Sequence, residues 1–190
     1  MEYVPILELP LLIIMVLIRA AILRRQGVKA LVFGATDKTD FVIIPIVFTF
    51  FYAITAAIFD LPFPQIFKNS FWNFNFLLIS VAIIICSVAL LCFAATLKTF
   101  GKSFRVGIDE NTKDELITNG TFAISRNPIY LAFITFFAGI FVAYPNISTL
   151  AFLLLLTATV HRQILREEKF LKNHYGAQYE EYCKKVRRYI

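Results

Sequence analysis

The feature that most constrains this chain is a series of apolar runs, each about as long as a bilayer is thick. The runs fall at residues 3–23, 41–59, 76–97, 128–144 and 147–165. A helix needs roughly 20 predominantly apolar residues to cross the hydrocarbon core of a membrane. Only 17% of the residues are charged, against about 25% in a typical soluble domain. The sequence therefore predicts an all-α integral membrane protein with five transmembrane helices.

The basic residues predict how these helices are oriented. Of the 19 Lys and Arg residues, only Lys68 falls on the side of the membrane that would hold the N-terminus. Lys and Arg are enriched in cytoplasmic loops, so the N-terminus is predicted outside and the C-terminus in the cytoplasm. Topology and anionic membrane lipid then explain the net charge of +6, and no nucleic-acid partner is predicted.

The chain is predicted to divide into two parts. Residues 1–97 would form three membrane helices, and residues 98–190 would form the catalytic half. The catalytic half opens with the longest polar insertion of the chain, residues 98–125, and Pro128 follows it at the start of the next apolar run. Proline suits the first position of a helix, because its φ is fixed and its missing N–H would have no helical partner. A polar loop that leads into a buried helix is a favourable place for chemistry in a membrane protein.

Two polar segments of the catalytic half are predicted to meet. The turn at residues 144–146 is so short that the helices on either side of it must lie antiparallel. The end of the last helix therefore returns to the level of residues 126–130. Helical spacing groups its polar residues into three pairs that each share a face: His161 with Glu168, Gln163 with Glu167, and Arg162 with Arg166.

These residues alone leave a structural role open. An acidic and basic run where a helix leaves the membrane is typical of a solvated face, and Glu168 and Lys172 have the spacing of an ordinary i, i+4 ion pair. The three cysteines have no spacing that is typical of a metal site or of a disulfide framework. No metal is therefore predicted.

Two motifs follow each other along residues 98–190. The first reads Leu-Ile-Thr-Asn-Gly at residues 116–120 and Arg-Asn-Pro-Ile-Tyr at residues 126–130, and the second is Glu167-Glu168 followed by Gly176, Tyr179 and Tyr182. Together they resemble the C-terminal half of the isoprenylcysteine carboxyl methyltransferase family. Members of that family are integral membrane enzymes that use S-adenosylmethionine to methylate the C-terminal carboxylate of a prenylated cysteine. The family usually has Arg-His-Pro where this chain has Asn127 in the middle position, and asparagine holds no proton at neutral pH.

The resemblance implies a set of site residues. The implied cofactor pocket for S-adenosylmethionine consists of Asp114, Glu115, Leu116, Ile117, Phe122, Asn127, Pro128, Ile129, Tyr130 and Glu167. An arginine that holds the substrate carboxylate is also implied, and its family position falls on Gln163 here. Arg162 and Arg166 flank that position and are the candidates for this catalytic role. The implied partners are a lipophilic, prenylcysteine-like substrate from the bilayer and membrane lipids, at an active site that faces the cytoplasm.

Three alternatives stay open. A phospholipid N-methyltransferase of the same architecture would have to remove a proton from an amine, which would give Glu168 or His161 a role. A sterol-reductase-like enzyme would use NADPH and would share the tail pattern around Tyr175 and Tyr182. A non-enzymatic membrane scaffold or small transporter is disfavoured, because the polar residues collect on one side rather than in the middle of the membrane.

Overall fold

The computed structural model describes residues 4–25, 43–59, 61, 62, 64, 75–101 and 116–190. Within these ranges every regular element is a helix, as predicted. The elements are α1 (Val4–Arg25), α2 (Ile43–Ile58), α4 (Phe76–Phe100), the 3₁₀ helix η3 (Gly120–Ala123), α5 (Pro128–Ala143), α6 (Ile147–Tyr175) and α7 (Ala177–Lys185). Each of the five predicted apolar runs therefore forms a helix, and Pro128 takes the first position of α5 as expected.

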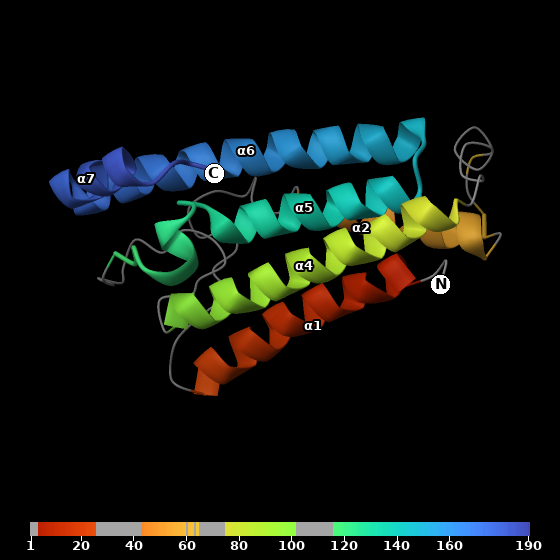
Figure 1. Cartoon of the computed structure of the whole chain (residues 1–190), viewed down its shortest axis with the longest axis horizontal. Helices are drawn as coiled ribbons and strands as arrows, with labels where there is room; N and C mark the ends of the chain where they lie inside the picture. The colour runs from red at the N-terminus through yellow and green to blue at the C-terminus, as the bar shows by residue number, and fades with distance from the viewer. Residues whose placement is uncertain (1–3, 26–42, 60, 63, 65–74, 102–115) are drawn as a thin grey trace.

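Helices α1, α4 and α6 run in one direction, and α5 runs in the opposite direction (Figure 1). Two contacts fix α1 parallel to α4. Ser87 Oγ donates a hydrogen bond to Glu8 Oε1 at 2.9 Å, and the Arg19 guanidinium donates to the Gly101 carbonyl. The partners are separated by 79 and 82 positions in the sequence. The residue numbers of the partners therefore increase together along α1 and α4, as they do in parallel helices.

One end of the bundle holds the last residues of α1 and α4 and the first residue of α5 (Figure 1). We call it the polar end, and we define it by Arg25, Gly101 and Pro128. Helix α6 continues past this end, and α7 folds back beside it (Figure 1). With a rise of about 1.5 Å per residue, α6 is about 43 Å long and α5 only about 24 Å. Gly176, with φ of 53°, separates α6 from α7, and such a positive φ favours glycine.

Among the helices that the structure describes, two are long and apolar enough to cross a membrane. These are α4, with 25 residues, and α6, with 29 residues. The Pro45–Ala56 part of α2 and the whole of α5 are shorter apolar helices. Large apolar side chains are exposed on α1 and α4, among them Leu11, Leu17, Ile84 and Leu91. Exposed apolar surface on this scale is typical of a protein that contacts lipid.

The turn between α5 and α6 is stabilised by Asn146. Its side-chain oxygen accepts hydrogen bonds from the backbone N–H groups of Ser148 at 2.8 Å and Thr149 at 2.9 Å. Thr149 Oγ1 in turn donates to the Tyr144 carbonyl at 2.7 Å. These bonds satisfy polar groups that the ends of two helices would otherwise leave unpaired. The predicted tight, antiparallel hairpin is confirmed.

Helices α4 and α5 approach each other closely because the facing residues are small. Ala82, Cys86 and Ala89 of α4 are buried next to Phe136 and Gly139 of α5. A Cβ atom on residue 139 would lie 2.5 Å from Cys86 Sγ and 3.3 Å from the Cys86 backbone nitrogen. Small residues allow such close backbone approach between apolar helices. Residue 139 must therefore be glycine, because there is no room for a Cβ atom.

We expect Gly139→Ala to lower the thermal stability of the purified protein. The added methyl group must push α4 and α5 apart, and overpacking of this kind costs about 1–3 kcal/mol. The measurement is the midpoint of thermal unfolding in detergent. Adding Cys86→Ala removes the nearest atom and should recover part of the loss. An unchanged midpoint for Gly139→Ala would contradict the close packing described here.

Candidate active site

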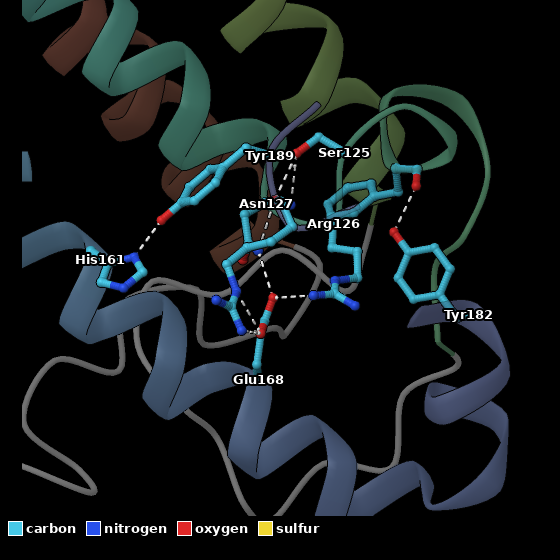
Figure 2. A network of polar contacts seen from close by, with 9 residues as sticks. Ser125, Arg126, Asn127, His161, Glu168, Tyr182 and Tyr189 are labelled. Atoms are coloured by element: carbon cyan, nitrogen blue, oxygen red, sulfur yellow. Dashed lines mark hydrogen bonds and ion pairs between the residues drawn. The ribbon is translucent and has the colours of Figure 1, made fainter. Parts of the chain in front are cut away.

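The polar end brings together side chains of the turn before α5, of α6 and of residues 186–190 (Figure 2). Asn127, which precedes α5, and Glu168 of α6 are both buried. Asn127 Nδ2 donates to Glu168 Oε1 at 3.0 Å, although the two residues are 41 positions apart. This contact confirms that the entry to α5 and the end of α6 meet.

Both carboxylate oxygens of Glu168 are engaged (Figure 2). Arg126 Nη2 lies 3.2 Å from Oε1, while Arg188 Nε and Nη2 lie 2.9 Å and 2.8 Å from Oε2. The Glu168 side chain is only 10% exposed, and a buried carboxylate needs this degree of compensation. Two guanidinium groups and one carboxylate leave the cluster with one excess positive charge. Lys172 instead pairs with Glu180 of α7 at 3.0 Å, so the ordinary i, i+4 pair with Glu168 was the wrong interpretation.

Residues 186–190 run across the entry to α5. The Arg126 backbone N–H donates to the Arg187 carbonyl at 3.0 Å. Ser125 Oγ and Asn127 Nδ2 both donate to the Arg188 carbonyl at 3.2 Å. The backbone of this segment is therefore anchored independently of its side chains.

Tyr189 reaches from the same segment to α6 (Figure 2). Its hydroxyl lies 2.5 Å from His161 Nδ1, and its ring packs against the apolar core. Burial raises the pKa of Tyr189, so the phenol stays protonated at neutral pH. His161 is therefore paired with a neutral partner that belongs to residues 186–190.

Glu167, the neighbour of Glu168, faces a different set of groups. Its Oε1 accepts hydrogen bonds from Tyr130 Oη at 2.5 Å and from Gln163 Nε2 at 3.0 Å. Arg166 Nη1 donates to Gln163 Oε1 at 3.2 Å. The predicted pairing of Gln163 with Glu167 on one face of the helix is confirmed. Successive side chains on a helix point in directions about 100° apart. Glu167 and Glu168 therefore contact two different sets of groups.

Helix α7 holds η3 in place. Tyr182 Oη donates to the Phe122 carbonyl at 2.6 Å (Figure 2). The Phe122 ring packs edge-to-face on Phe100, with 4.8 Å between the ring centroids. Burial raises the pKa of Tyr182 to about 12, so its hydroxyl remains a donor at neutral pH. Tyr179 of the same helix is also buried, but its hydroxyl has no hydrogen-bond partner among the described residues.

The predicted cofactor residues lie in several surroundings. Asp114 and Glu115 are outside the described residues. Leu116 and Ile117 are half-buried before η3, and Phe122 is buried within it. Those brought together at the polar end are Asn127, Pro128, Ile129, Tyr130 and Glu167.

The two candidate arginines are placed differently. Arg162 is exposed on α6, whereas Arg166 is half-buried and bonded to Gln163. Of the two, Arg166 is therefore the one that the structure connects to the Glu167 and Tyr130 surroundings.

Sequence reasoning missed most of the cluster around Glu168. Arg126 was seen only as part of a motif, and Arg188 was given no role. A signal was available in the adjacent acidic residues Glu167 and Glu168. A carboxylate at the edge of an apolar bundle needs cationic partners, and residues 184–188 are the most basic stretch that follows it.

In the part of the chain that the structure describes, fold and site together define a class: a helical protein with helices apolar enough to cross a membrane and a buried polar network at one end. Comparison with known proteins specifies the family. Residues 75–178, more than half of the chain, match the phospholipid methyltransferase family. The chain therefore belongs to that family.

Individual relatives carry a more specific name. A probable protein-S-isoprenylcysteine O-methyltransferase of Oryza sativa subsp. indica is 37% identical over 91 residues, which cover 46% of this chain and 48% of the relative. Protein-S-isoprenylcysteine O-methyltransferase A of Arabidopsis thaliana is 32% identical over 124 residues, or 63% of this chain and 59% of the relative. The protein-S-isoprenylcysteine O-methyltransferase of Schizosaccharomyces pombe is 36% identical over 89 residues, which cover 45% of this chain and 38% of the relative. The predicted resemblance to this group is confirmed.

The matched regions span about half of the length of these relatives. No solved structure matches the chain.

We expect Tyr182→Phe to lower stability and Tyr179→Phe not to lower it. Loss of the Tyr182 hydroxyl leaves the Phe122 carbonyl without its donor, which costs about 1–3 kcal/mol. Loss of the Tyr179 hydroxyl removes a buried polar group that has no partner, so stability should be unchanged or slightly raised. Thermal unfolding of the two variants side by side measures the difference. An unchanged midpoint for Tyr182→Phe would mean that this hydrogen bond contributes nothing, and a loss for Tyr179→Phe would contradict an unpaired hydroxyl at that position.

Proposed function

We propose that this protein is an integral membrane methyltransferase. It uses S-adenosylmethionine to methylate the C-terminal carboxylate of a prenylated cysteine, or of a similar lipophilic acceptor. Membership of the phospholipid methyltransferase family and the names of the relatives support this reaction class. The observation that carries the proposal is the meeting of Tyr130 with Glu167 at the polar end, across 37 positions of sequence.

The donor and acceptor groups at the polar end fit the proposed cofactor. Glu167 offers a carboxylate to a ribose hydroxyl or to an ammonium group, and Tyr130 already orients it. The buried Arg126 Nε has no hydrogen-bond partner among the described residues, so a donor is left over for an anionic group. Phe122, Pro128 and Ile129 add apolar surface. With Asp114 to Ile117 and Asn127, these are the residues that would hold S-adenosylmethionine.

The reaction requires the protein to align the acceptor carboxylate with the methyl donor, but it does not require removal of a proton. S-adenosylmethionine, when bound, supplies a methyl group on a positively charged sulfur. The acceptor carboxylate is already ionised at neutral pH, so a general base is unnecessary. An arginine can hold a carboxylate through two parallel hydrogen bonds, and we assign this role to Arg162 and Arg166, with Arg166 in the more favourable position. Alignment and the exclusion of water then provide the acceleration.

The proposed topology places the site at the cytoplasmic face. Five spans with the N-terminus outside would put residues 98–125, the entry to α5 and the end of α6 on the same, cytoplasmic side. The charge distribution of the sequence supports this, because all but one of its 19 Lys and Arg residues fall in segments that this topology assigns to the cytoplasmic side. The cofactor would then come from the cytoplasm, and the lipophilic substrate from the bilayer.

A second acceptor class is favoured by the family match itself. The family is named for phospholipid methylation, and an amine acceptor in a lipid headgroup would need a base. Glu167 is the carboxylate that the structure places beside Tyr130. Assay of a prenylated cysteine against phosphatidylethanolamine, with radiolabelled S-adenosylmethionine, separates the two classes.

We expect the detergent-purified protein to bind S-adenosylhomocysteine in isothermal calorimetry. Glu167→Ala should abolish the binding, because it removes the carboxylate at the centre of the proposed pocket. NADPH, titrated in parallel, should give no heat of binding. Binding of NADPH instead of S-adenosylhomocysteine would overturn the methyltransferase proposal in favour of a reductase.

Arg162→Ala, Arg166→Ala and the double variant test the carboxylate clamp. We expect the double variant to lose turnover by about 100-fold or more, because hydrogen bonds to charged groups are worth about 1.5–3 kcal/mol each. Binding of S-adenosylhomocysteine should persist, because the clamp acts on the acceptor. Normal turnover in all three variants would show that neither arginine holds the acceptor.

A further inference from the structure

We propose that residues 186–190 form a positioning strap for the active site, and that Arg188 sets the affinity for the cofactor by fixing the orientation of Glu167. The inference rests on the proposed function, because it assumes that Glu167 contacts the cofactor. The strap lies beyond residues 75–178, which match the family.

Apolar packing of α6 in the core extends as far as Ile164, which is fully buried one turn before the site. The helix continues for many residues beyond the first residue of α5 (Figure 1). Its outward face here is exposed at Arg162, Leu165 and Lys169. Beyond Ile164, Glu167 and Glu168 are the side chains that join α6 to the entry of α5 and to Tyr130. The orientation of this last part of α6 therefore depends on how firmly these two side chains are held.

The strap holds Glu168 from one side, and Arg126 and Asn127 hold it from the other. Arg188 supplies both hydrogen bonds to Oε2, while Arg126 and Asn127 share Oε1. Glu168 is therefore held between two elements that are themselves tied together by backbone hydrogen bonds. Without Arg188, one carboxylate oxygen would lose its partners and α6 could turn toward Arg126.

A turn of α6 at Glu168 would change the direction of Glu167. The two residues are adjacent on a rigid helix, about 100° apart. Glu167 Oε1 receives a hydrogen bond of 2.5 Å from Tyr130, and hydrogen bonds weaken steeply when their geometry is lost. Arg188 thus acts on the proposed cofactor site through Glu168, without contacting the cofactor.

The strap backbone does not depend on the Arg188 side chain. The carbonyls of Arg187 and Arg188 accept hydrogen bonds from Ser125, Arg126 and Asn127, and Tyr189 pairs with His161. Removing the guanidinium should therefore leave the strap in place and remove only its contact with Glu168. This separation makes the inference testable with single substitutions.

The experiment is calorimetric titration of S-adenosylhomocysteine into wild type, Arg188→Gln and Arg187→Gln. Arg187 is the matched control, because its side chain is exposed and its loss changes the net charge equally. We expect Arg188→Gln to weaken binding by about tenfold or more, since hydrogen bonds to charged groups are worth about 1.5–3 kcal/mol. Arg187→Gln should stay within about twofold of wild type, because its backbone carbonyl is unchanged.

Two further variants separate positioning from general destabilisation. Gly139→Ala lowers stability far from the site and should leave the affinity for S-adenosylhomocysteine unchanged. Arg188→Lys keeps the positive charge beside Glu168, but it lacks the planar donors of arginine. We expect its affinity for S-adenosylhomocysteine to fall between those of wild type and Arg188→Gln. All titrations are made well below the unfolding midpoint of each variant.

The outcomes distinguish this inference from the proposed function. If wild type fails to bind S-adenosylhomocysteine, the proposed function is wrong and the inference falls with it. If wild type binds S-adenosylhomocysteine and both Arg188 variants bind it with the affinity of wild type, only the strap inference is overturned. Equal weakening in Arg187→Gln or in Gly139→Ala would also overturn it, because the effect would then be one of charge or of stability.

Discussion

The polar end depends on the burial of one carboxylate. Glu168 is nine-tenths buried, and removing an ion from water costs several kcal/mol unless other groups compensate. Compensation comes from the turn before α5, through Arg126 and Asn127, and from residues 186–190, through Arg188. Three segments that are distant in sequence are thereby brought to one point. Because Glu167 is the preceding residue on the same helix, this arrangement also fixes the direction of its side chain.

The apolar part of the molecule provides the frame on which this point is built. Close packing of α4 on α5 around Gly139 holds these two helices together, and the Asn146 turn fixes where α6 returns. Neither feature contributes a polar group to the site. The turn returns α6 beside α5, so that Glu167 and Glu168 lie at the level of Tyr130 and Asn127.

Much of the fold follows from the sequence, because length and apolarity are summed over many residues. The helices, the hairpin and the meeting of α5 with the end of α6 were all predicted. The partners of Glu168 were not. An i, i+4 spacing to Lys172 is a local signal, whereas Arg188 reaches Glu168 only because α7 folds back after Gly176. Side-chain pairing at a helix exit is decided by such tertiary contacts. The roles of Arg162, Arg166 and the pocket residues remain predictions.

The hydrogen bonds made by residues 186–190 have a consequence for the order of assembly. They join positions about 60 apart in the chain, and contacts of such long range form after local ones. The α5–α6 hairpin is complete in the sequence before the strap begins. During folding the hairpin can therefore form with Glu168 held from one side only. The helices can pack first, and the site reaches its final geometry only when residues 186–190 are in place.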